Sequence, residues 1–377
     1  EPFFGGLLPE EGVRDRVARY LGVSARNDFA LLEQIGGECA GAVTLTLPGE
    51  SAGHMDGSTA VSEEDAEAGL RALTPERLAK LLDELPHRPL LAGGERRLSL
   101  AGAQDKVAVS LVEGEIAIPI GVEPTTHILK TPILGFAGTV ANELLCMRTA
   151  ARVGLRVAFA ERRVASGREF LLVERFDRIF RDDGSVDRVH QEDMCQALGV
   201  PTRLKYQSEG GPSLPDCFGL LTEHARRPAM DRLALLRATA FNVLIGNADA
   251  HAKNFSLVHA AEGISLSPLY DLLSTLAYED LSPRYAMKIG SKAEFKNIRA
   301  RHWDALAEAS GLAPAQVRRE LKEMLGKLPN ALEAEAAALQ AEQLERGATE
   351  MVERLVRATR ERCDLTAVRL KERATGA

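Results

Sequence analysis

The stretch Ile245-Gly-Asn-Ala-Asp249-Ala-His251-Ala-Lys253-Asn254-Phe-Ser256 decides the fold class of this chain. It follows a long segment with helical spacing of apolar residues and leads into a short apolar run, which predicts a loop between a helix and a strand. Phosphoryl transfer to a hydroxyl needs a carboxylate that orients the hydroxyl and accepts its proton, together with oxygen ligands for Mg²⁺. The Asp-x-x-x-x-Asn spacing therefore predicts Asp249 as a catalytic carboxylate and Asn254 as a metal ligand.

A second acidic residue follows this loop, in Ser267-Pro-Leu-Tyr-Asp271-Leu-Leu273. Asp271 stands at the end of a short strand-like segment, where kinases carry their second metal-binding acid. The usual Asp-Phe-Gly triplet is replaced by Asp-Leu-Leu, so the similarity to ordinary eukaryotic kinases is partial. We expect Asp271 to be the other Mg²⁺ ligand.

The upstream residues supply candidates for binding ATP phosphates. Lys130 ends the strand-like run His127–Lys130, and Glu143 lies in the following helical segment, where it can pair with the lysine. The candidate phosphate loop is formed by Ala101, Gly102, Ala103, Gln104, Asp105 and Lys106, just before a strand-like run. Each signal is weak alone, since Lys130 and Glu143 could be a surface ion pair, Asp271 a turn residue and His251 an ordinary loop histidine. Their order along the chain is the order that a bilobal kinase requires.

Composition narrows the class of protein. The 377 residues exceed one ordinary core, and the net charge of −7 argues against a general nucleic-acid binder. The basic residues between 354 and 373 are interleaved with acidic ones, which predicts a solvated helix face. Five scattered cysteines favour a reducing compartment, and no apolar stretch approaches the ~18 residues of a membrane span, so we expect a cytoplasmic protein.

Periodicity predicts an α+β fold with a protein-kinase-like, bilobal organisation. Helical spacing is expected over 12–21, 29–35, 73–85 (capped by Thr74, with Pro75 at its first position) and 139–153, and then over 231–245, 314–328 and most of 331–372. Strands are expected over 41–47, 107–112, 115–120, 127–130, 156–164 and 170–173, forming mostly one antiparallel sheet, and a surface loop over 48–65. Residues 1–176 would form a sheet-containing N-terminal lobe and residues 177–377 a mostly helical C-terminal lobe.

These residues resemble the HipA family, the kinase toxins of bacterial toxin–antitoxin pairs. The resemblance covers nearly the whole chain and rests on seven ordered motifs. They are Phe-Phe-Gly-Gly-Leu-Leu-Pro at 3–9, Ser99-Leu-Ala-Gly-Ala-Gln-Asp-Lys106, Pro124-Thr-Thr-His-Ile-Leu-Lys130, Val173-Glu-Arg-Phe-Asp-Arg178, Gln191-Glu-Asp-Met-Cys-Gln196, Lys205-Tyr206 with Gly210-Gly211-Pro212, and Asp249-Ala-His-Ala-Lys-Asn-Phe-Ser256.

The resemblance implies a role for each of the site residues. Residues 101–106 and Lys130 would bind the ATP phosphates, Glu174, Arg175 and Phe176 would form the hinge beside adenine, and His251 would also contact ATP. Asp249 would be the catalytic base, with Mg²⁺ held by Asn254 and Asp271. Ser99, just before the phosphate loop, would be autophosphorylated, and its added charge would displace the loop and switch the enzyme off.

The resemblance also implies partners. Family members phosphorylate an aminoacyl-tRNA synthetase, the best-known target being glutamyl-tRNA synthetase, and are neutralised by HipB-like helix-turn-helix antitoxins that carry them to operator DNA. Full-length relatives have a small strand-rich subdomain ahead of the segment 3–9. Its absence here leads us to expect that the chain is trimmed or that a separate small protein supplies this part.

Two other kinds of function remain open from the sequence. A small-molecule or lipid kinase can use the same two-lobed arrangement, and a degenerate kinase could act as a co-repressor subunit with a DNA-binding antitoxin. The sequence has no His-Glu-x-x-His zinc motif, no Gly-x-Ser-x-Gly elbow and no Walker phosphate loop. Phosphoryl transfer is the chemistry that the residues favour.

Overall fold

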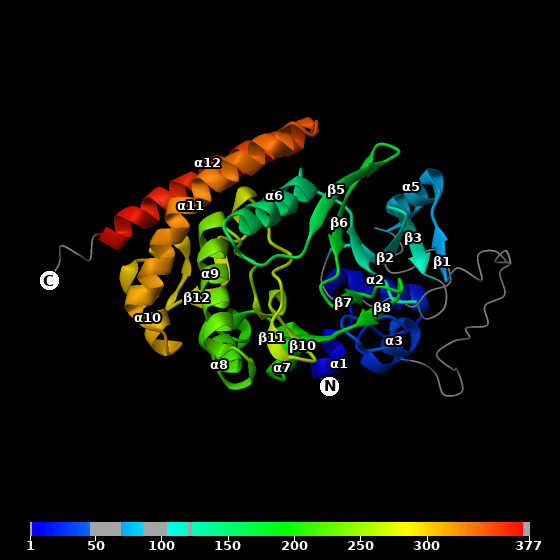
Figure 1. Ribbon diagram of the computed structural model, residues 1–377, viewed down its shortest axis with the longest axis horizontal. Helices are drawn as coiled ribbons and strands as arrows, with labels where there is room; N and C mark the ends of the chain where they lie inside the picture. The colour runs from blue at the N-terminus through cyan, green and yellow to red at the C-terminus, as the bar shows by residue number, and fades with distance from the viewer. Residues whose placement is uncertain (1, 46–68, 86–103, 120–122, 372–377) are drawn as a thin grey trace. The chain divides into compact units, whose positions relative to one another are not determined.

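The computed structural model describes residues 2–45, 69–85, 104–119 and 123–371 (Figure 1). The chain divides into two compact units: unit 1 comprises residues 1–133 and 159–192, and unit 2 comprises residues 134–158 and 193–377. The lobe boundary after residue 176 stays a prediction. The compact units differ from it in two segments, because 134–158 belongs to unit 2 and 177–192 belongs to unit 1.

Unit 1 begins with three short helices, α1 (Pro2–Gly6), α2 (Glu11–Leu21) and α3 (Asp28–Ile35). Val13 of α2 and Leu31 of α3 share a buried cluster with Leu8, which follows α1, so the helical spacing predicted for α2 and α3 is confirmed. The strand predicted over 41–47 is wrong for residues 41–45, which form a turn and irregular backbone. Gly41 has φ +73°, which breaks a strand, and a Cβ there would lie 2.7 Å from Gln191 N.

The centre of unit 1 is a six-stranded sheet of order β1-β3-β2-β4-β6-β5, antiparallel throughout. Its strands are β1 (Leu70–Ala72), β2 (Lys106–Val112), β3 (Glu115–Pro119), β4 (His127–Lys130), β5 (Ala160–Ala165) and β6 (Arg168–Glu174). Helix α5 (Pro75–Glu84) packs its leucines against the sheet and is capped by Thr74, as predicted. The expected strands are confirmed, although β5 begins four residues later than the apolar run. The predicted loop 48–65 lies outside the described residues.

The remaining strands of unit 1 are β7 (Arg178–Phe180) and β8 (Val186–Arg188), which pair with each other, and β9 (His190–Asp193), whose last residue already belongs to unit 2. Strands β4 and β6 are neighbours in the sheet, with Lys130 opposite Leu171 and His127 opposite Glu174. The predicted ATP lysine and Glu174, the first residue of the predicted hinge, therefore lie on adjacent strands.

Unit 2 is mostly helical. Its helices are α6 (Thr139–Arg152), α7 (Met194–Ala197), α8 (Leu214–His224), α9 (Pro228–Ile245), α10 (Ala300–Ala309), α11 (Pro314–Gln340) and α12 (Arg346–Lys371). Its hairpins are β10 (Ser256–Ala260) with β11 (Gly263–Leu266), and β12 (Arg284–Ile289) with β13 (Lys292–Glu294). The long helices α11 and α12 pack against α6 and α9 (Figure 1). The predicted helices are confirmed, and α11 continues through Pro329.

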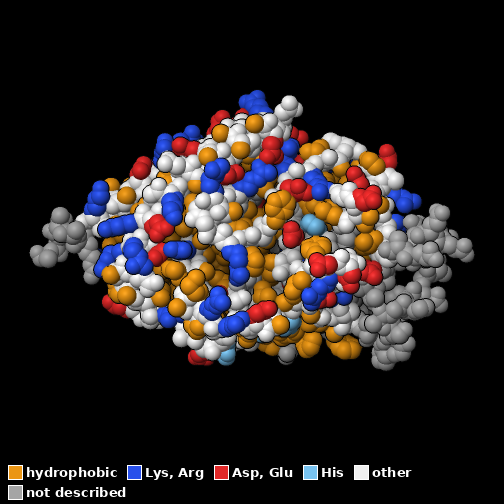
Figure 2. Space-filling view, in the orientation of Figure 1, with side chains coloured by type: hydrophobic (Ala, Val, Ile, Leu, Met, Phe, Trp, Pro, Cys, Tyr) orange, Lys and Arg blue, Asp and Glu red, His pale blue; other side chains and the backbone are white. Residues whose placement is uncertain are grey.

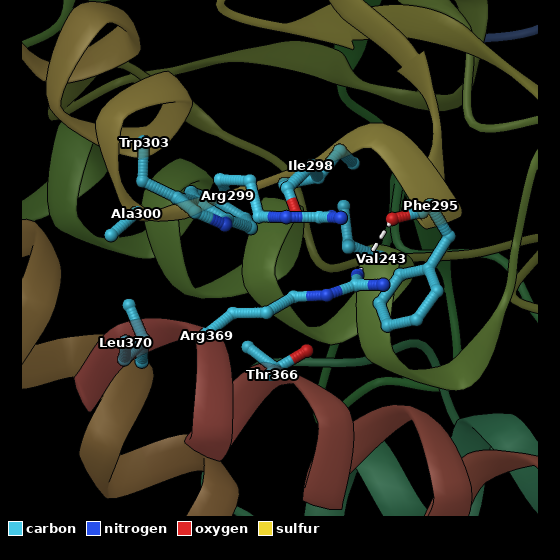
Figure 3. Close-up of a pocket in the computed structure, with 9 residues that line it drawn as sticks. All are labelled: Val243, Phe295, Ile298, Arg299, Ala300, Trp303, Thr366, Arg369 and Leu370. Carbon is cyan, nitrogen blue, oxygen red and sulfur yellow. Dashed lines mark hydrogen bonds between the residues drawn. The ribbon is translucent and has the colours of Figure 1, made fainter. Parts of the chain in front are cut away.

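The basic residues of α12 correct a prediction made from the sequence. Arg362 is buried and donates hydrogen bonds to the carbonyl oxygens of Leu244 (2.8 Å) and Ile245 (2.7 Å), the last residues of α9. Arg369 donates to Phe295 O over 2.9 Å and lies 4.9 Å from the centre of its ring (Figure 3). A long guanidinium side chain can reach the carbonyl groups that a helix end leaves without intrahelical partners. The expected solvated face is therefore wrong at Arg362, whereas Arg369 is only partly buried.

Surface charge is mixed in the view of Figure 2, where Lys and Arg are interspersed with Asp and Glu. Within the described ranges, no helix is both long enough and apolar enough to cross a bilayer.

Candidate active site

The loop that carries Asp249 begins where α9 ends. Gly246 follows α9 with φ +83°, a left-handed conformation that suits glycine and lets the chain leave the helix. The next residues are held through their backbone: Ala248 N donates to Thr275 Oγ1 (2.8 Å), and Ala248 O accepts from Ala286 N (2.8 Å). These contacts come from the segment after β11 and from β12. The loop is thus fixed by two segments far away in the sequence.

The carboxylate of Asp249 has a phenol beside it. Tyr206 Oη donates to Asp249 Oδ1 over 2.9 Å, and the Tyr206 ring meets the His251 ring edge to face, with centroids 5.4 Å apart. The backbone of Asp249 is also anchored, because its N–H donates to Asn247 Oδ1 at 3.2 Å. The predicted catalytic carboxylate is therefore held through both its side chain and its backbone.

The two predicted metal ligands lie side by side. Asn254 Nδ2 donates to Asp271 Oδ2 over 2.9 Å, and Asn254 Oδ1 accepts the backbone N–H of His251 (3.1 Å). Asp271 has φ +56°, a left-handed conformation that non-glycine residues rarely adopt and that costs of order 1 kcal/mol. Such strain is typical of functional sites.

This donor set fits Mg²⁺. A carboxylate and an amide oxygen are the hard ligands that Mg²⁺ prefers, and the ion is usually bound by one or two such groups together with substrate phosphates and water. No group of three or more His, Cys, Asp or Glu side chains suited to a metal occurs among the residues that the structure describes. Asn254 and Asp271 are therefore suited to a metal that arrives with a nucleotide.

Buried polar contacts hold these loops in place. Asn142 of α6 accepts from Ser274 N (2.8 Å) and donates to Ser274 O (3.0 Å), which fastens the segment after Asp271. Lys253, inside the Asp249 loop, pairs with Asp193 over 2.6 Å in a buried ion pair. Glu143, predicted to support the ATP lysine, is also buried on α6, in unit 2.

The predicted phosphate-binding residues belong to unit 1. Gln104 Nε2 donates to Thr131 O (2.8 Å), Asp105 pairs with Arg16, and Lys106 lies opposite Lys130 in the β2–β4 register. Lys130 is buried. Ala101, Gly102 and Ala103 of the predicted loop, and Ser99 before it, lie outside the described residues.

The predicted hinge has an unexpected feature at Arg175. Its guanidinium is buried and donates to Asp177 (2.8 and 2.9 Å) and to Thr125 Oγ1 (2.7 Å), with Glu38 at 3.3 Å. The Arg175 N–H donates to Thr126 O, and the Glu174 N–H donates to Phe159 O. The Arg175 side chain is thus directed into a buried ionic cluster, so a contact with a nucleotide would have to come from its backbone. The ATP-binding role of Glu174, Arg175 and Phe176 stays a prediction.

Sequence reasoning missed several residues that shape the site. Tyr206 and Asp193 stand in motifs that carried the family resemblance, but nothing in their spacing connected them to Asp249 or Lys253. Asn142 stands next to Glu143 in a segment that periodicity described only as a helix. These contacts join segments between 43 and 132 residues apart, so local patterns could not reveal them.

The α+β fold, and a loop that carries both Asp249 and Asn254 with Asn254 bonded to Asp271, are the arrangement expected of a protein of the kinase class. Comparison with known proteins narrows that class. The model of the HipA-like C-terminal domain matches residues 98–332, and the model of the HipA N-terminal domain matches residues 1–46. The chain therefore belongs to the HipA family of kinase toxins.

Individual relatives agree with this assignment. A putative kinase of Sinorhizobium fredii, Y4mE, is 50% identical over 338 residues, covering 88% of this chain and 77% of that protein. The serine/threonine-protein kinase toxin HipA of Shewanella oneidensis is 32% identical over 344 residues, covering 88% of this chain and 76% of the toxin. In a solved complex of Shewanella oneidensis HipA with HipB and operator DNA, the matching chain superposes with a TM-score of 0.82 at 29% identity, covering 98% of this chain and 86% of that one.

Proposed function

We propose that this chain is an ATP- and Mg²⁺-dependent Ser/Thr protein kinase with Asp249 as its catalytic carboxylate. The observation that carries the proposal is the arrangement within unit 2, where loops anchored by buried contacts hold Asp249 and the bonded pair Asn254 and Asp271. A carboxylate fixed near two metal-ligating oxygens is what phosphoryl transfer to a hydroxyl requires. The kinase relatives support the same reaction.

In this mechanism Asp249 orients the acceptor hydroxyl and takes its proton as the hydroxyl oxygen attacks the γ-phosphorus of ATP, with ADP as the leaving group. Asn254 and Asp271 would hold Mg²⁺, which neutralises charge on the phosphates when it is bound. Lys130, Gln104, Asp105, Lys106 and the glycine loop at 101–103 are assigned to the phosphates. Glu174, Arg175, Phe176 and His251 are assigned to the remainder of the nucleotide.

The proposed targets are cytosolic translation proteins, aminoacyl-tRNA synthetases and in particular glutamyl-tRNA synthetase, and the cytoplasm is the compartment that we propose for this chain. The proposed neutralising partner is a HipB-like helix-turn-helix antitoxin, through which contact with operator DNA would be made. The solved HipA neighbour is bound to HipB and its operator DNA, which supports the partner class.

The central experiment compares the parent with Asp249→Ala in the presence of γ-labelled ATP, Mg²⁺ and purified aminoacyl-tRNA synthetases. Asp249→Ala should lower transfer by orders of magnitude while ATP binding stays close to that of the parent. Equal labelling by both proteins would refute the role of Asp249. Labelling of metabolites or lipids in place of proteins would favour a small-molecule or lipid kinase. If the parent protein does not bind ATP, the result would favour a degenerate kinase that acts as a co-repressor.

We also propose that Ser99 is the autophosphorylation site that switches the enzyme off. A phosphate there adds a charge of about −1.5 to −2 beside a loop assigned to ATP phosphates, and the two would repel. Ser99→Ala should abolish self-labelling and keep transfer to the target. Phosphopeptide mapping by mass spectrometry checks the site, and phosphate found on another residue of the parent would contradict the assignment.

A further inference from the structure

The contact between Tyr206 and Asp249 has a consequence for catalysis. Tyr206 Oη donates to one oxygen of the carboxylate, Oδ1, at 2.9 Å. A carboxylate that acts as a base needs one oxygen aimed at the acceptor hydroxyl, and a fixed donor on the other oxygen limits rotation of the group. The phenol and a substrate hydroxyl can therefore use the same carboxylate together.

The loop that carries Tyr206 is built to hold its position. Tyr206 O accepts the backbone N–H groups of Glu209 and Gly211, each at 3.0 Å. Gly211 is required at this turn, because a Cβ there would lie 1.9 Å from Leu204 O and 2.8 Å from Tyr206 O. The next residue, Gln207, accepts the backbone N–H of Lys288 over 2.7 Å and so fastens the loop to β12.

The Tyr206 ring is also held by its neighbours. The His251 ring meets it at an interplanar angle of 78°, and Lys205 Nζ lies 5.2 Å from its centroid. His251 and Lys205 are two titratable groups in contact with the Tyr206 ring, and Asp271 is bonded to Asn254 in the loop that carries Asp249. A side chain held by its backbone, a histidine ring and a cation is poorly suited to swing away as a gate.

Resting on the proposed kinase function, we infer that Tyr206 is a positioning residue for the catalytic base: its phenol holds Asp249 Oδ1 so that Oδ2 receives the proton of the acceptor hydroxyl. The substrate oxygen forms a bond to the γ-phosphorus, the bond from phosphorus to the β,γ-bridging oxygen breaks, and ADP leaves. The phenol keeps its own proton throughout. It acts by orienting the carboxylate and by favouring its ionised form.

The test compares Tyr206→Phe with the parent and with Tyr20→Phe, a control at an exposed residue of α2. Tyr206→Phe should lower kcat about tenfold and leave the KM for ATP unchanged, because the hydroxyl that it removes donates to the proposed base. The acidic limb of its kcat/KM profile should move up by about one pH unit, since the carboxylate loses a donor that favours its charge. Tyr20→Phe should match the parent in every value.

Several outcomes would overturn the inference. Unchanged kcat and pH profile in Tyr206→Phe would show that the contact does not serve the reaction. A rise in kcat/KM for the protein substrate would show that Tyr206 is an obstacle that the substrate must displace. Circular dichroism melts establish that each variant folds. Gly211→Ala, which keeps the hydroxyl and displaces the turn, should lower kcat in the same direction as Tyr206→Phe.

One experiment distinguishes a failure of this inference from a failure of the proposed function. If the parent transfers no phosphate to any acceptor, the kinase proposal fails, but the Tyr206 contact can still be tested by ¹³C NMR of aspartate-labelled protein. The Asp249 signal, assigned by its loss in Asp249→Ala, should titrate at a higher pH in Tyr206→Phe than in the parent. Equal titration midpoints would refute the contact with no reference to activity.

Discussion

The buried ionic cluster around Glu38 allows a quantitative prediction of the free energy of unfolding. Glu38 accepts hydrogen bonds from Arg178 (2.8 Å), Arg188 (2.8 Å) and Thr125, and Arg175 lies at 3.3 Å. All of these residues belong to unit 1. The Glu38 side chain is only 4% exposed. Glu38→Gln would keep the shape of the side chain and remove the charge that the buried arginines face.

The expected magnitude follows from the pKa of Glu38. Burial alone would raise this pKa, but the guanidinium groups of Arg175, Arg178 and Arg188 outweigh burial and lower it from 4.5 to about 2. Each pH unit between the folded and unfolded pKa is worth about 1.4 kcal/mol, so the ionised carboxylate contributes about 3 kcal/mol to the free energy of unfolding. Breaking a buried pair by removing one partner typically costs about 3–5 kcal/mol, which agrees.

The sign of the pH dependence is set by the lowered pKa. The contribution of Glu38 is fully present above its unfolded pKa of 4.5 and is lost as the pH falls toward about 2. Asp177 adds to the same trend: burial would raise its pKa, but Arg175 and Arg178 lower it from 3.8 to about 2. We therefore expect the parent to lose stability between about pH 4.5 and 2, and Glu38→Gln to lose less over that interval.

Urea unfolding followed by far-UV circular dichroism at pH 7 and at several values below pH 4.5 measures both effects. The matched control is Glu323→Gln, which removes an exposed ion pair with Lys327 and should leave the midpoint near that of the parent. A midpoint for Glu38→Gln equal to that of the control at pH 7 would refute the reasoning. An equally steep acid loss in Glu38→Gln and the parent would show that other carboxylates dominate.

Two further predictions concern unit 2. Arg362→Met should lower the free energy of unfolding by about 2–4 kcal/mol and reduce phosphoryl transfer, because the last carbonyls of α9 lose their buried donor. Thermal melts and kinase assays compare it with Arg357→Met, a variant at an exposed residue of α12. Equal values for the two variants would contradict the prediction. Asn142→Leu should cost about 3 kcal/mol, since it leaves the N–H and C=O of Ser274 without their amide partner. It should also lower kcat through the nearby Asp271, and a stable variant with parental kcat would count against this role.

The sequence predicted most of the elements because their signals are local. The strand His127–Lys130 agrees with the structure at both ends, and the helix expected from Thr139 ends one residue before the predicted Val153. Alternation and helical spacing reflect which face of an element is buried, and the chain carries that information within a few residues. The strand expected over 41–47 failed at its start because the chain at Gly41 turns to contact Gln191, far away in the sequence.

For the candidate site, the sequence indicated which residues take part but not how the fold holds them. Residue type and order were enough to select Asp249, Asn254 and Asp271, and the structure shows Asn254 bonded to Asp271, while the roles of all three stay predictions. The left-handed backbone of Asp271 and the burial of Arg362 were not accessible in this way. Arg362 stands among acidic and basic neighbours that resemble a solvated helix, and only the packing of α12 against α9 shows what it binds.

The contacts that hold the loop around Asp249 explain how a short sequence motif can specify a precise geometry. Arg362 of α12 binds the end of α9, where the loop begins, and the loop itself is bound by Thr275 from the segment after Asp271 and by Tyr206 from the turn before α8. Each support satisfies a different polar group: the final carbonyls of α9, the N–H of Ala248 and the carboxylate of Asp249. A displacement of the loop would break several of these bonds at once, and buried polar groups without partners are costly. The geometry at Asp249 therefore depends on contacts from the whole folded unit, and the spacing between Asp249 and Asn254 does not reveal those contacts.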